Sequence, residues 1–253
     1  MKGYAILRFD KKSGSAAGIE AHHERRKEEY KSNPDIRTEH SEQNIHLITP
    51  EDRYNQEIKS RIKTAEEANK DFLVRKNSVR YVDTLITASP NYFTLKRPEE
   101  IERYFKVALG FFEEKVDERN IISAVIHVDE ETPHMHLVFV PLTEDYRLSA
   151  KDIIGGPAGC RKWQDEFFEK MSGAFPDLLR GRDVKTTGRK HLPVQEFKEV
   201  TSEDDRFRLW KLENEVKSSR KYVDSIPTEI KKDIEKHIAE ETRQKSKKER
   251  DLK

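Results

Sequence analysis

Two apolar segments separated by a short polar connection constrain the fold of this chain more than any other feature. Residues Ile121–Val128 are almost entirely apolar, and residues His134–Pro141 are strongly apolar again. The connection, Asp129–Pro133, has three acidic residues and ends in proline, which is typical of a turn. Two β-rich runs joined so closely predict an antiparallel hairpin of two central strands.

The other periodic segments place more strands and several helices around this hairpin. Strands are expected over Tyr4–Phe9 and Arg80–Ala88, with a short extended piece over Asn44–Ile48. Three-to-four spacing of apolar residues predicts helices. These cover Ile19–Tyr30, 51–72 (opened by Pro50), Glu99–Lys115, Ala158–Ser172, Leu192–Asp224 and Thr228–Lys253. The pattern predicts an α+β fold with a central antiparallel sheet and flanking helices, divided into a domain over 1–200 and a charged helical extension over 201–253.

Composition excludes some classes of protein. Charged residues make up 38% of the chain and hydrophobic residues 34%, and no run of about 18 apolar residues could cross a membrane. The N-terminal residues contain no apolar signal stretch, and the single cysteine, Cys160, allows no intramolecular disulfide. We therefore expect a cytoplasmic protein without a membrane segment.

Three of the nine histidines fall on the predicted hairpin, at His127, His134 and His136. His134 and His136 are two residues apart, so a strand directs both to one face and Met135 to the other. His127 lies on the partner strand near the turn, where it can join them. Three converging imidazoles with open coordination positions are typical of a catalytic metal site, and burying them without a ligand would be costly. Imidazole suits Zn, Fe, Ni or Cu, whereas phosphate chemistry suggests Mg or Mn.

The segment Ile126–His136 resembles the metal motif of the MobV, or Pre/Mob, relaxases, which belong to the HUH endonucleases. Weaker matches occur in the family's order over about residues 1–200. They are Tyr4–Arg8, His22-His23-Glu24-Arg25 (with His23 where Asn is usual), Asn44, Arg75-Lys76, Lys190-His191 and Glu196–Lys198.

The resemblance implies a metal-dependent enzyme that nicks one DNA strand at an origin and stays attached to it. His127, His134 and His136 would hold Mn²⁺ or Mg²⁺, with Mn²⁺ favoured. His22 matches the family's nucleophile, and neutral imidazole is a competent nucleophile near pH 7. Glu130 matches the active-site glutamate that orients this ring or accepts its proton.

The sequence does not decide which of the adjacent His22 and His23 is the nucleophile. Neighbouring side chains on a helix point about 100° apart, so only one of the two is expected to serve, and the motif match favours His22. Tyr30 and Tyr54 are reserve candidates whose simpler roles are packing or surface exposure.

The expected partner is origin DNA, single-stranded or in a hairpin. The net charge of +1 does not mark a strongly basic protein, but basic residues cluster after Arg180. DNA contacts are predicted at Arg25, Asn44, Arg75, Lys76, Arg182, Lys185, Arg189 and Lys190. The charged C-terminal helices could also support a homodimer.

Two other functions fit the histidine triad. A phosphodiesterase or nuclease could use a metal-activated water, and it would form no covalent adduct and would not need His22. A non-enzymatic DNA-binding or replication module could hold a structural metal, which calls for a fourth protein ligand, and Asp129 or Glu130 could supply it.

Overall fold

A six-stranded sheet forms the centre of the fold in the computed structural model, which describes residues 2–27, 29–30, 33 and 36–181. All of these residues belong to one compact unit, Met1–Arg189. The strand order is β2-β4-β5-β3-β1-β6. The strands are β1 Gly3–Lys12, β2 Ile45–Ile48, β3 Tyr81–Ala88, β4 Ile121–His127, β5 His134–Phe139 and β6 Leu178–Arg180.

The expected central hairpin is confirmed, with β4 and β5 as the neighbouring strands inside the sheet. Every strand pair is antiparallel except β1 with β6, so the antiparallel sheet becomes mixed at one edge. In the register of the hairpin, His127 lies directly opposite His134, and His136 lies opposite Val125. Paired residues share a face of the sheet, so the three histidines point to the same side.

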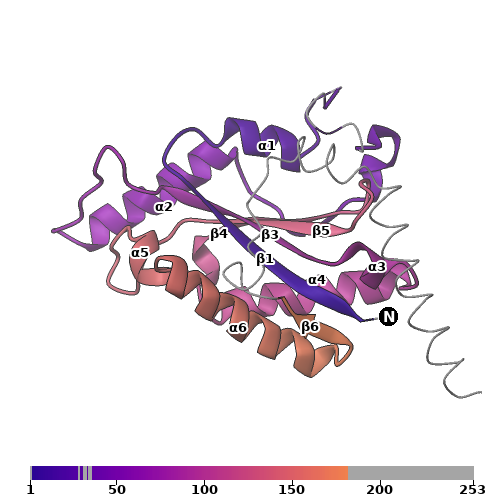
Figure 1. Ribbon diagram of the computed structural model, residues 1–253. Coiled ribbons are helices and arrows are strands. Elements are labelled where there is room, and N and C mark those ends of the chain that lie inside the picture. The colour runs from indigo at the N-terminus through magenta and orange to yellow at the C-terminus, as the bar shows by residue number, and fades with distance from the viewer. Residues whose placement is uncertain (1, 28, 31–32, 34–35, 182–253) are drawn as a thin grey trace, which may run out of the picture. The chain divides into compact units, whose positions relative to one another are not determined.

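Helices cover both faces of the sheet (Figure 1). α1 and α2 lie over one face, and α4 and α6 lie over the other. The α-helices are α1 Ala17–His23, α2 Tyr54–Ala68, α3 Pro90–Phe93, α4 Pro98–Glu113, α5 Ala150–Ile153 and α6 Pro157–Ala174, with 3₁₀ turns at Thr38–Gln43 and Glu118–Asn120. None of the helices in the described part of the chain is both long and apolar enough to cross a membrane.

The larger hydrophobic core lies under α4 and α6. Phe112 of α4 and Trp163 of α6 pack with ring centroids 5.5 Å apart, and both belong to the same buried cluster as Met135 and Phe139 of β5. Each such side chain contributes about 1.5–3 kcal/mol by leaving water. Met135 therefore points into this core while its neighbours His134 and His136 point to the opposite face, toward α1, as the alternation of the strand predicts.

Two expected helices are shorter than predicted. The helix expected over Ile19–Tyr30 ends at His23, because Arg25 has a positive φ of 47° and the chain leaves the helical path there. The helix expected over 51–72 spans Tyr54–Ala68 and is not opened by Pro50, since Arg53 at its N-cap and Asn69 at its C-cap are extended. The expected helices over 192–224 and 228–253, and the domain boundary at residue 200, lie outside the described residues.

Candidate active site

The hairpin brings its three histidine rings together. Ring centroids are 5.1 Å apart for His127 and His134, 5.2 Å for His134 and His136, and 5.3 Å for His127 and His136. His127 is fully buried, with 0% of its surface exposed. The convergence predicted from the spacing is therefore present in the fold.

Backbone oxygens fix the tautomers of two of these rings. His134 Nδ1 lies 2.9 Å from the carbonyl oxygen of Thr132, and His127 Nε2 lies 2.9 Å from that of His23. A carbonyl oxygen can only accept, so in each pair the ring N–H donates. The lone pairs of His134 Nε2 and His127 Nδ1 are left free, and these two atoms are 3.3 Å apart.

The third ring is oriented by a carboxylate on β3. His136 Nδ1 donates to Asp83 Oδ1 at 3.2 Å, which leaves the lone pair of Nε2 free. Burial alone would raise the pKa of Asp83, but the interactions with His136 and the nearby His23 ring outweigh it and lower that pKa, so the acceptor is a carboxylate. A histidine held by a carboxylate or carbonyl on one nitrogen is the usual arrangement of a metal ligand.

These donor atoms fit a bound metal ion. Among the described residues, three groups bring ligand atoms within 4.8 Å of one another. The groups are His22–His127–His136, His127–Glu130–His134 and His23–Asp83–His136. Burial lowers the pKa of each hairpin histidine, so the rings stay neutral and keep the lone pair that a metal requires. A cation bound among these rings would explain why buried imidazoles keep free lone pairs without hydrogen-bond donors.

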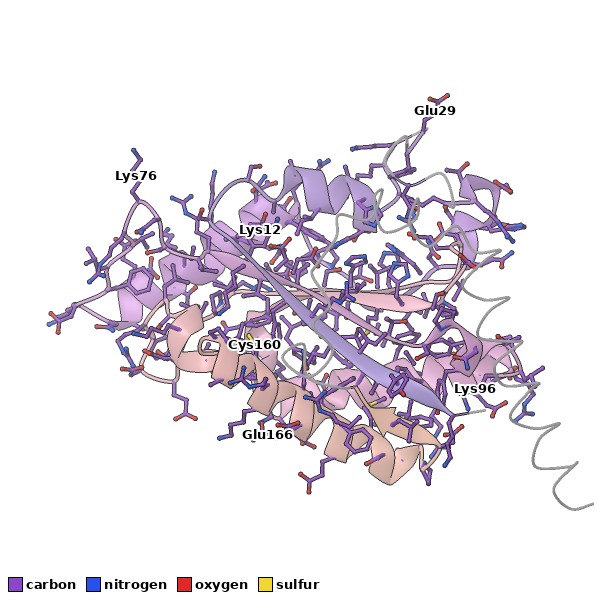
Figure 2. All side chains as sticks on the ribbon, viewed as in Figure 1. Lys12, Glu29, Lys76, Lys96, Cys160 and Glu166 are labelled. Atoms are coloured by element: carbon purple, nitrogen blue, oxygen red, sulfur yellow. The ribbon has the colours of Figure 1, made fainter. Side chains whose placement is uncertain are left out.

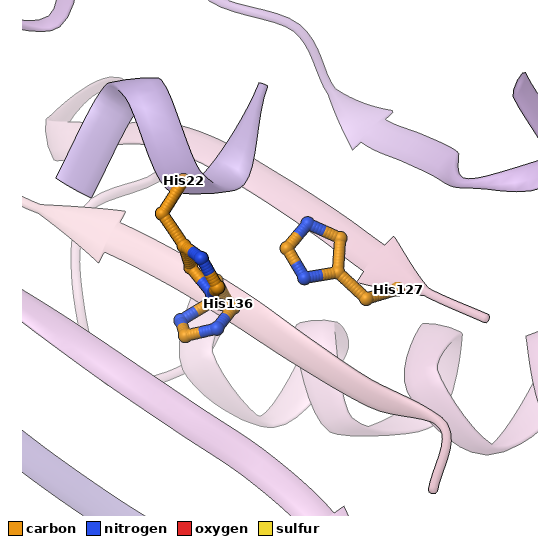
Figure 3. Close-up of side chains that lie close together, drawn as sticks. All are labelled: His22, His127 and His136. Carbon is orange, nitrogen blue, oxygen red and sulfur yellow. The ribbon is translucent and has the colours of Figure 1, made fainter. Parts of the chain in front are cut away.

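Helix α1 delivers His22 to the same place (Figure 3). The His22 ring lies 5.3 Å from His136 and 5.6 Å from His127 between centroids. Burial, then the charge of Arg25, lowers the pKa of His22 to about 4, so the ring is neutral at pH 7. His22 thus combines a position beside the hairpin with the protonation state of a nucleophile.

Arg25 connects the end of α1 to the turn of the hairpin. Its guanidinium donates to both carboxylate oxygens of Asp129 at 2.8 Å, to Glu130 Oε1 at 2.7 Å and to the His22 carbonyl oxygen at 2.9 Å. Its side chain is only 7% exposed. Burial alone would raise the pKa of Asp129, but hydrogen bonds from Arg25 and Ser41 lower it to about 2. The guanidinium therefore acts here as an internal clamp.

Glu130 lies at the edge of the histidine cluster. Its Oε1 is 3.7 Å from His134 Nε2 and 4.0 Å from His127 Nδ1, the two nitrogens with free lone pairs. Its Oε2 accepts from Asn33 Nδ2 at 2.7 Å. The carboxylate is thus placed beside the predicted metal position, where it could orient a neighbour or act as a further ligand.

His22 and His23 both lie close to the cluster, and the expectation that only one of them serves as nucleophile stays a prediction. The His23 ring stacks on His136 at 4.0 Å between centroids. The His22 ring lies at similar distances from His127 and His136, whereas the His23 ring packs closely on His136 alone.

Sequence reasoning missed Asp83 and the clamp role of Arg25. Asp83 is the one charged residue of the largely buried strand Tyr81–Ala88, and a lone carboxylate in a buried strand is a signal that could have identified it. No comparable pattern marks Arg25, because its partners Asp129 and Glu130 are more than 100 residues away in the chain.

The other predicted site residues lie apart from the histidines. Asn44 Oδ1 accepts from the Val128 backbone N–H at 2.9 Å, at the base of the hairpin turn. Arg75 and Lys76 are exposed on the loop after α2, and Lys76 projects outward there (Figure 2). Arg182, Lys185, Arg189 and Lys190 lie outside the described residues.

The two reserve tyrosines have structural contacts. Tyr54 is fully buried, and its hydroxyl lies 2.8 Å from both Glu24 Oε1 and Ser123 Oγ. Burial first, and the Glu24 charge, raise the pKa of Tyr54, which disfavours a phenolate nucleophile. Tyr30 donates to the Ala21 carbonyl oxygen at 3.0 Å, and its ring lies 5.9 Å from that of His22.

Comparison with known proteins identifies the family. The family model described as plasmid recombination enzyme (Mob_Pre) matches residues 1–199. The chain belongs to the plasmid recombination enzyme family. The resemblance inferred from the hairpin motif is thereby confirmed.

Relatives within the plasmid recombination enzyme family are longer than the matched region. A type 1 plasmid recombination enzyme of Staphylococcus aureus is 36% identical over 204 residues, covering 78% of this chain and 49% of the relative. A plasmid recombination enzyme of Bacillus thuringiensis is 36% identical over 205 residues, covering 79% of this chain and 43% of the relative. The chain thus spans about half the length of the curated relatives it matches.

Solved structures confirm the α+β fold. The MobM relaxase domain bound to plasmid pMV158 oriT DNA, with Mn at pH 6.8, aligns with a TM-score of 0.68 and 30% identity. It covers 78% of this chain and 99% of that domain. A second Mn-bound structure of that domain with oriT DNA, at pH 4.6, aligns with a TM-score of 0.66 and 28% identity.

Proposed function

We propose that this chain is a metal-dependent relaxase that nicks one strand of plasmid DNA at an origin of transfer and later rejoins it. The observation that carries the proposal is the position of His22. A neutral imidazole from α1 stands against a hairpin whose three histidines each keep one free nitrogen. A nucleophile and a metal-binding set are the two components that such a reaction requires.

His127, His134 and His136 are proposed to hold the divalent cation. Mn²⁺ is favoured over Mg²⁺ because imidazole nitrogen is a better ligand for Mn²⁺, and because the MobM relaxase domain is Mn-bound. The lowered pKa values of the three histidines support cation binding near neutral pH, because the rings are neutral there. The cation would supply polarisation of the scissile phosphate and balance its developing charge.

His22 is proposed as the nucleophile. A ring nitrogen donates its lone pair to phosphorus, the N–P bond forms, the bond from phosphorus to the 3′ oxygen breaks, and the strand leaves as a 3′ hydroxyl after gaining a proton. The ring loses its remaining proton, and Glu130 is the carboxylate positioned near this cluster to assist. The phosphoramidate keeps the energy of the broken bond, so attack by the 3′ hydroxyl rejoins the strand.

Origin DNA, single-stranded or in a hairpin, is the proposed partner, as it is for the MobM domain. Arg25, Asn44, Arg75, Lys76, Arg182, Lys185, Arg189 and Lys190 stay predicted DNA contacts. Of these, the exposed Arg75 and Lys76 are available to phosphates, whereas Arg25 is only 7% exposed and is already bonded to Asp129 and Glu130. A cytoplasmic location and a homodimer formed through the C-terminal region also stay predictions.

The test uses a single-stranded origin oligonucleotide labelled at its 3′ end. The wild-type chain and the His22→Ala variant are incubated with Mn²⁺ or with chelator and separated on denaturing gels at neutral or alkaline pH, because phosphoramidates are labile to acid. We expect a labelled protein–DNA adduct that needs Mn²⁺ and that is lost in His22→Ala.

Cleavage without an adduct, undiminished in His22→Ala, would instead indicate a nuclease that uses metal-activated water. The position of Glu130 beside the free nitrogens of His127 and His134 supports this alternative, because its carboxylate could act as the base for a water. Binding of the oligonucleotide with neither cleavage nor adduct would favour a non-enzymatic DNA-binding module.

A further inference from the structure

His23 lies beside His22 and packs against His136 of the metal-binding hairpin. Its ring stacks on that of His136, with 4.0 Å between centroids and 28° between planes. Its Nε2 is 3.4 Å from Asp83 Oδ2, while the other oxygen of Asp83 accepts from His136 Nδ1 at 3.2 Å. One carboxylate therefore serves both rings of a stacked pair.

The burial of His23 requires an explanation. Only 1% of its surface is exposed, yet neither ring nitrogen makes a hydrogen bond. A buried polar group without a hydrogen bond costs on the order of 1–3 kcal/mol. The cost indicates either a ligand for His23 or a role that its ring performs by position.

A second cation is the first explanation to consider, since His23, Asp83 and His136 have ligand atoms within 4.8 Å of one another. However, His136 Nδ1 must keep its proton to donate to Asp83, and its Nε2 is the atom proposed to bind the cation of the hairpin site. Only His23 and Asp83 would then remain as ligands, fewer than the three protein ligands of ordinary catalytic sites.

We infer that His23 is a positioning residue for the metal ligand His136, and that it is neither a second nucleophile nor a ligand. Its ring face fixes the plane of the His136 imidazole, and its Nε2 holds the far oxygen of Asp83. Its carbonyl oxygen also receives the N–H of His127, so the last residue of α1 supports two hairpin histidines. This inference rests on the proposed function, because it takes the hairpin as the metal site.

Affinity for Mn²⁺ is the property that distinguishes this role. In His23→Ala the stack and the carboxylate contact are both lost, whereas His23→Phe keeps an aromatic face over His136. Loss of a residue that orients a metal ligand costs about 10–100-fold in metal affinity. We expect that loss in His23→Ala and a smaller loss in His23→Phe, which keeps the stack on His136 but not the contact with Asp83.

The experiment titrates Mn²⁺ into the full chain and follows free Mn²⁺ by electron paramagnetic resonance, with circular dichroism as the check of folding. If His23→Ala does not fold, His23→Asn, which has no ring, replaces it. At saturating Mn²⁺ the His23→Phe variant should still form the covalent DNA adduct. Equal Mn²⁺ affinity in wild type and His23→Ala would overturn the inference. Loss of the adduct in His23→Phe would also overturn it. So would a stoichiometry of two Mn²⁺ per wild-type chain that falls to one in His23→Phe.

Failure of the proposed function would give different results. His134→Ala should lose Mn²⁺ binding, and His22→Ala should keep it while losing the adduct. If His134→Ala binds Mn²⁺ as the wild type does, the hairpin is not the metal site, whatever the His23 variants show.

Discussion

Arg25 illustrates how much of this site depends on a single side chain. Its φ of 47° is unusual for a residue other than glycine and costs on the order of 1–2 kcal/mol. The compensation is geometric, because from this backbone position one guanidinium reaches Asp129, Glu130 and the His22 carbonyl oxygen. An arginine has the planar set of donors that this requires, whereas a lysine ammonium does not.

Arg25→Lys should therefore damage the site although it preserves the charge. We expect covalent adduct formation to fall by about tenfold or more, and the free energy of unfolding to fall by about 1–3 kcal/mol, because buried carboxylate oxygens lose partners. Adduct yield and urea unfolding measure the two effects. Arg26→Lys is the matched control, since Arg26 is 38% exposed and ion-paired to Glu20. Equal damage from the two substitutions would contradict the clamp role.

At the scale of elements, α1 is too short to be stable by itself. A helix of seven residues is marginal in water, so tertiary contacts must hold it. The last carbonyl groups of a helix lack partners within the helix. At this end of α1, the His22 oxygen accepts from Arg25 and the His23 oxygen accepts from His127. Just beyond its end, Glu24 accepts from the Tyr54 hydroxyl of α2 and from His46 Nε2 of β2. The same contacts that stabilise α1 therefore place its histidines.

Tyr54→Phe tests this attachment. Removal of the hydroxyl leaves Ser123 Oγ buried without its partner and takes one of the two hydrogen bonds from Glu24. We expect the free energy of unfolding to fall by about 1–2 kcal/mol in urea. Tyr4→Phe, at an exposed tyrosine, should change it by less than about 0.5 kcal/mol. The adduct should persist in Tyr54→Phe, and its complete loss with normal Mn²⁺ affinity would reopen a tyrosine nucleophile.

The hairpin could be predicted from local periodicity in the sequence. The rest of the site could not, because it depends on contacts between residues far apart in the chain. Alternation along β5 was enough to place His134 and His136 on one face, and the turn placed His127 opposite. The approach of His23, the carboxylate of Asp83 and the clamp of Arg25 depend on how α1 and β3 pack around that hairpin. β6 was missed because three residues carry too little pattern, and its parallel pairing with β1 needs a long connection.

For the whole molecule, the histidine cluster couples stability to pH. Burial lowers the pKa of His22 from its ordinary value near 6.5 to about 4, and it also lowers the pKa values of His127, His134 and His136. Above about pH 6.5 these rings are neutral in the folded and unfolded states, so their burial adds no pH dependence there. As the pH falls from about 6.5 toward 4, the unfolded chain binds protons that the folded chain does not. Acidification must therefore destabilise the fold over that window.

The metal-free protein should lose at least about 1 kcal/mol of unfolding free energy between pH 7 and pH 5, measured by urea unfolding with chelator present. His134→Gln should flatten this dependence, because it removes one buried imidazole, while His40→Gln, at an exposed histidine outside the cluster, should not. Saturating Mn²⁺ should stabilise the wild type at both pH values, since the cation binds the folded state. A metal-free wild type whose stability is the same at pH 7 and pH 5 would show that the cluster takes up protons while folded, and neutral imidazoles could then no longer explain both the metal site and the nucleophile.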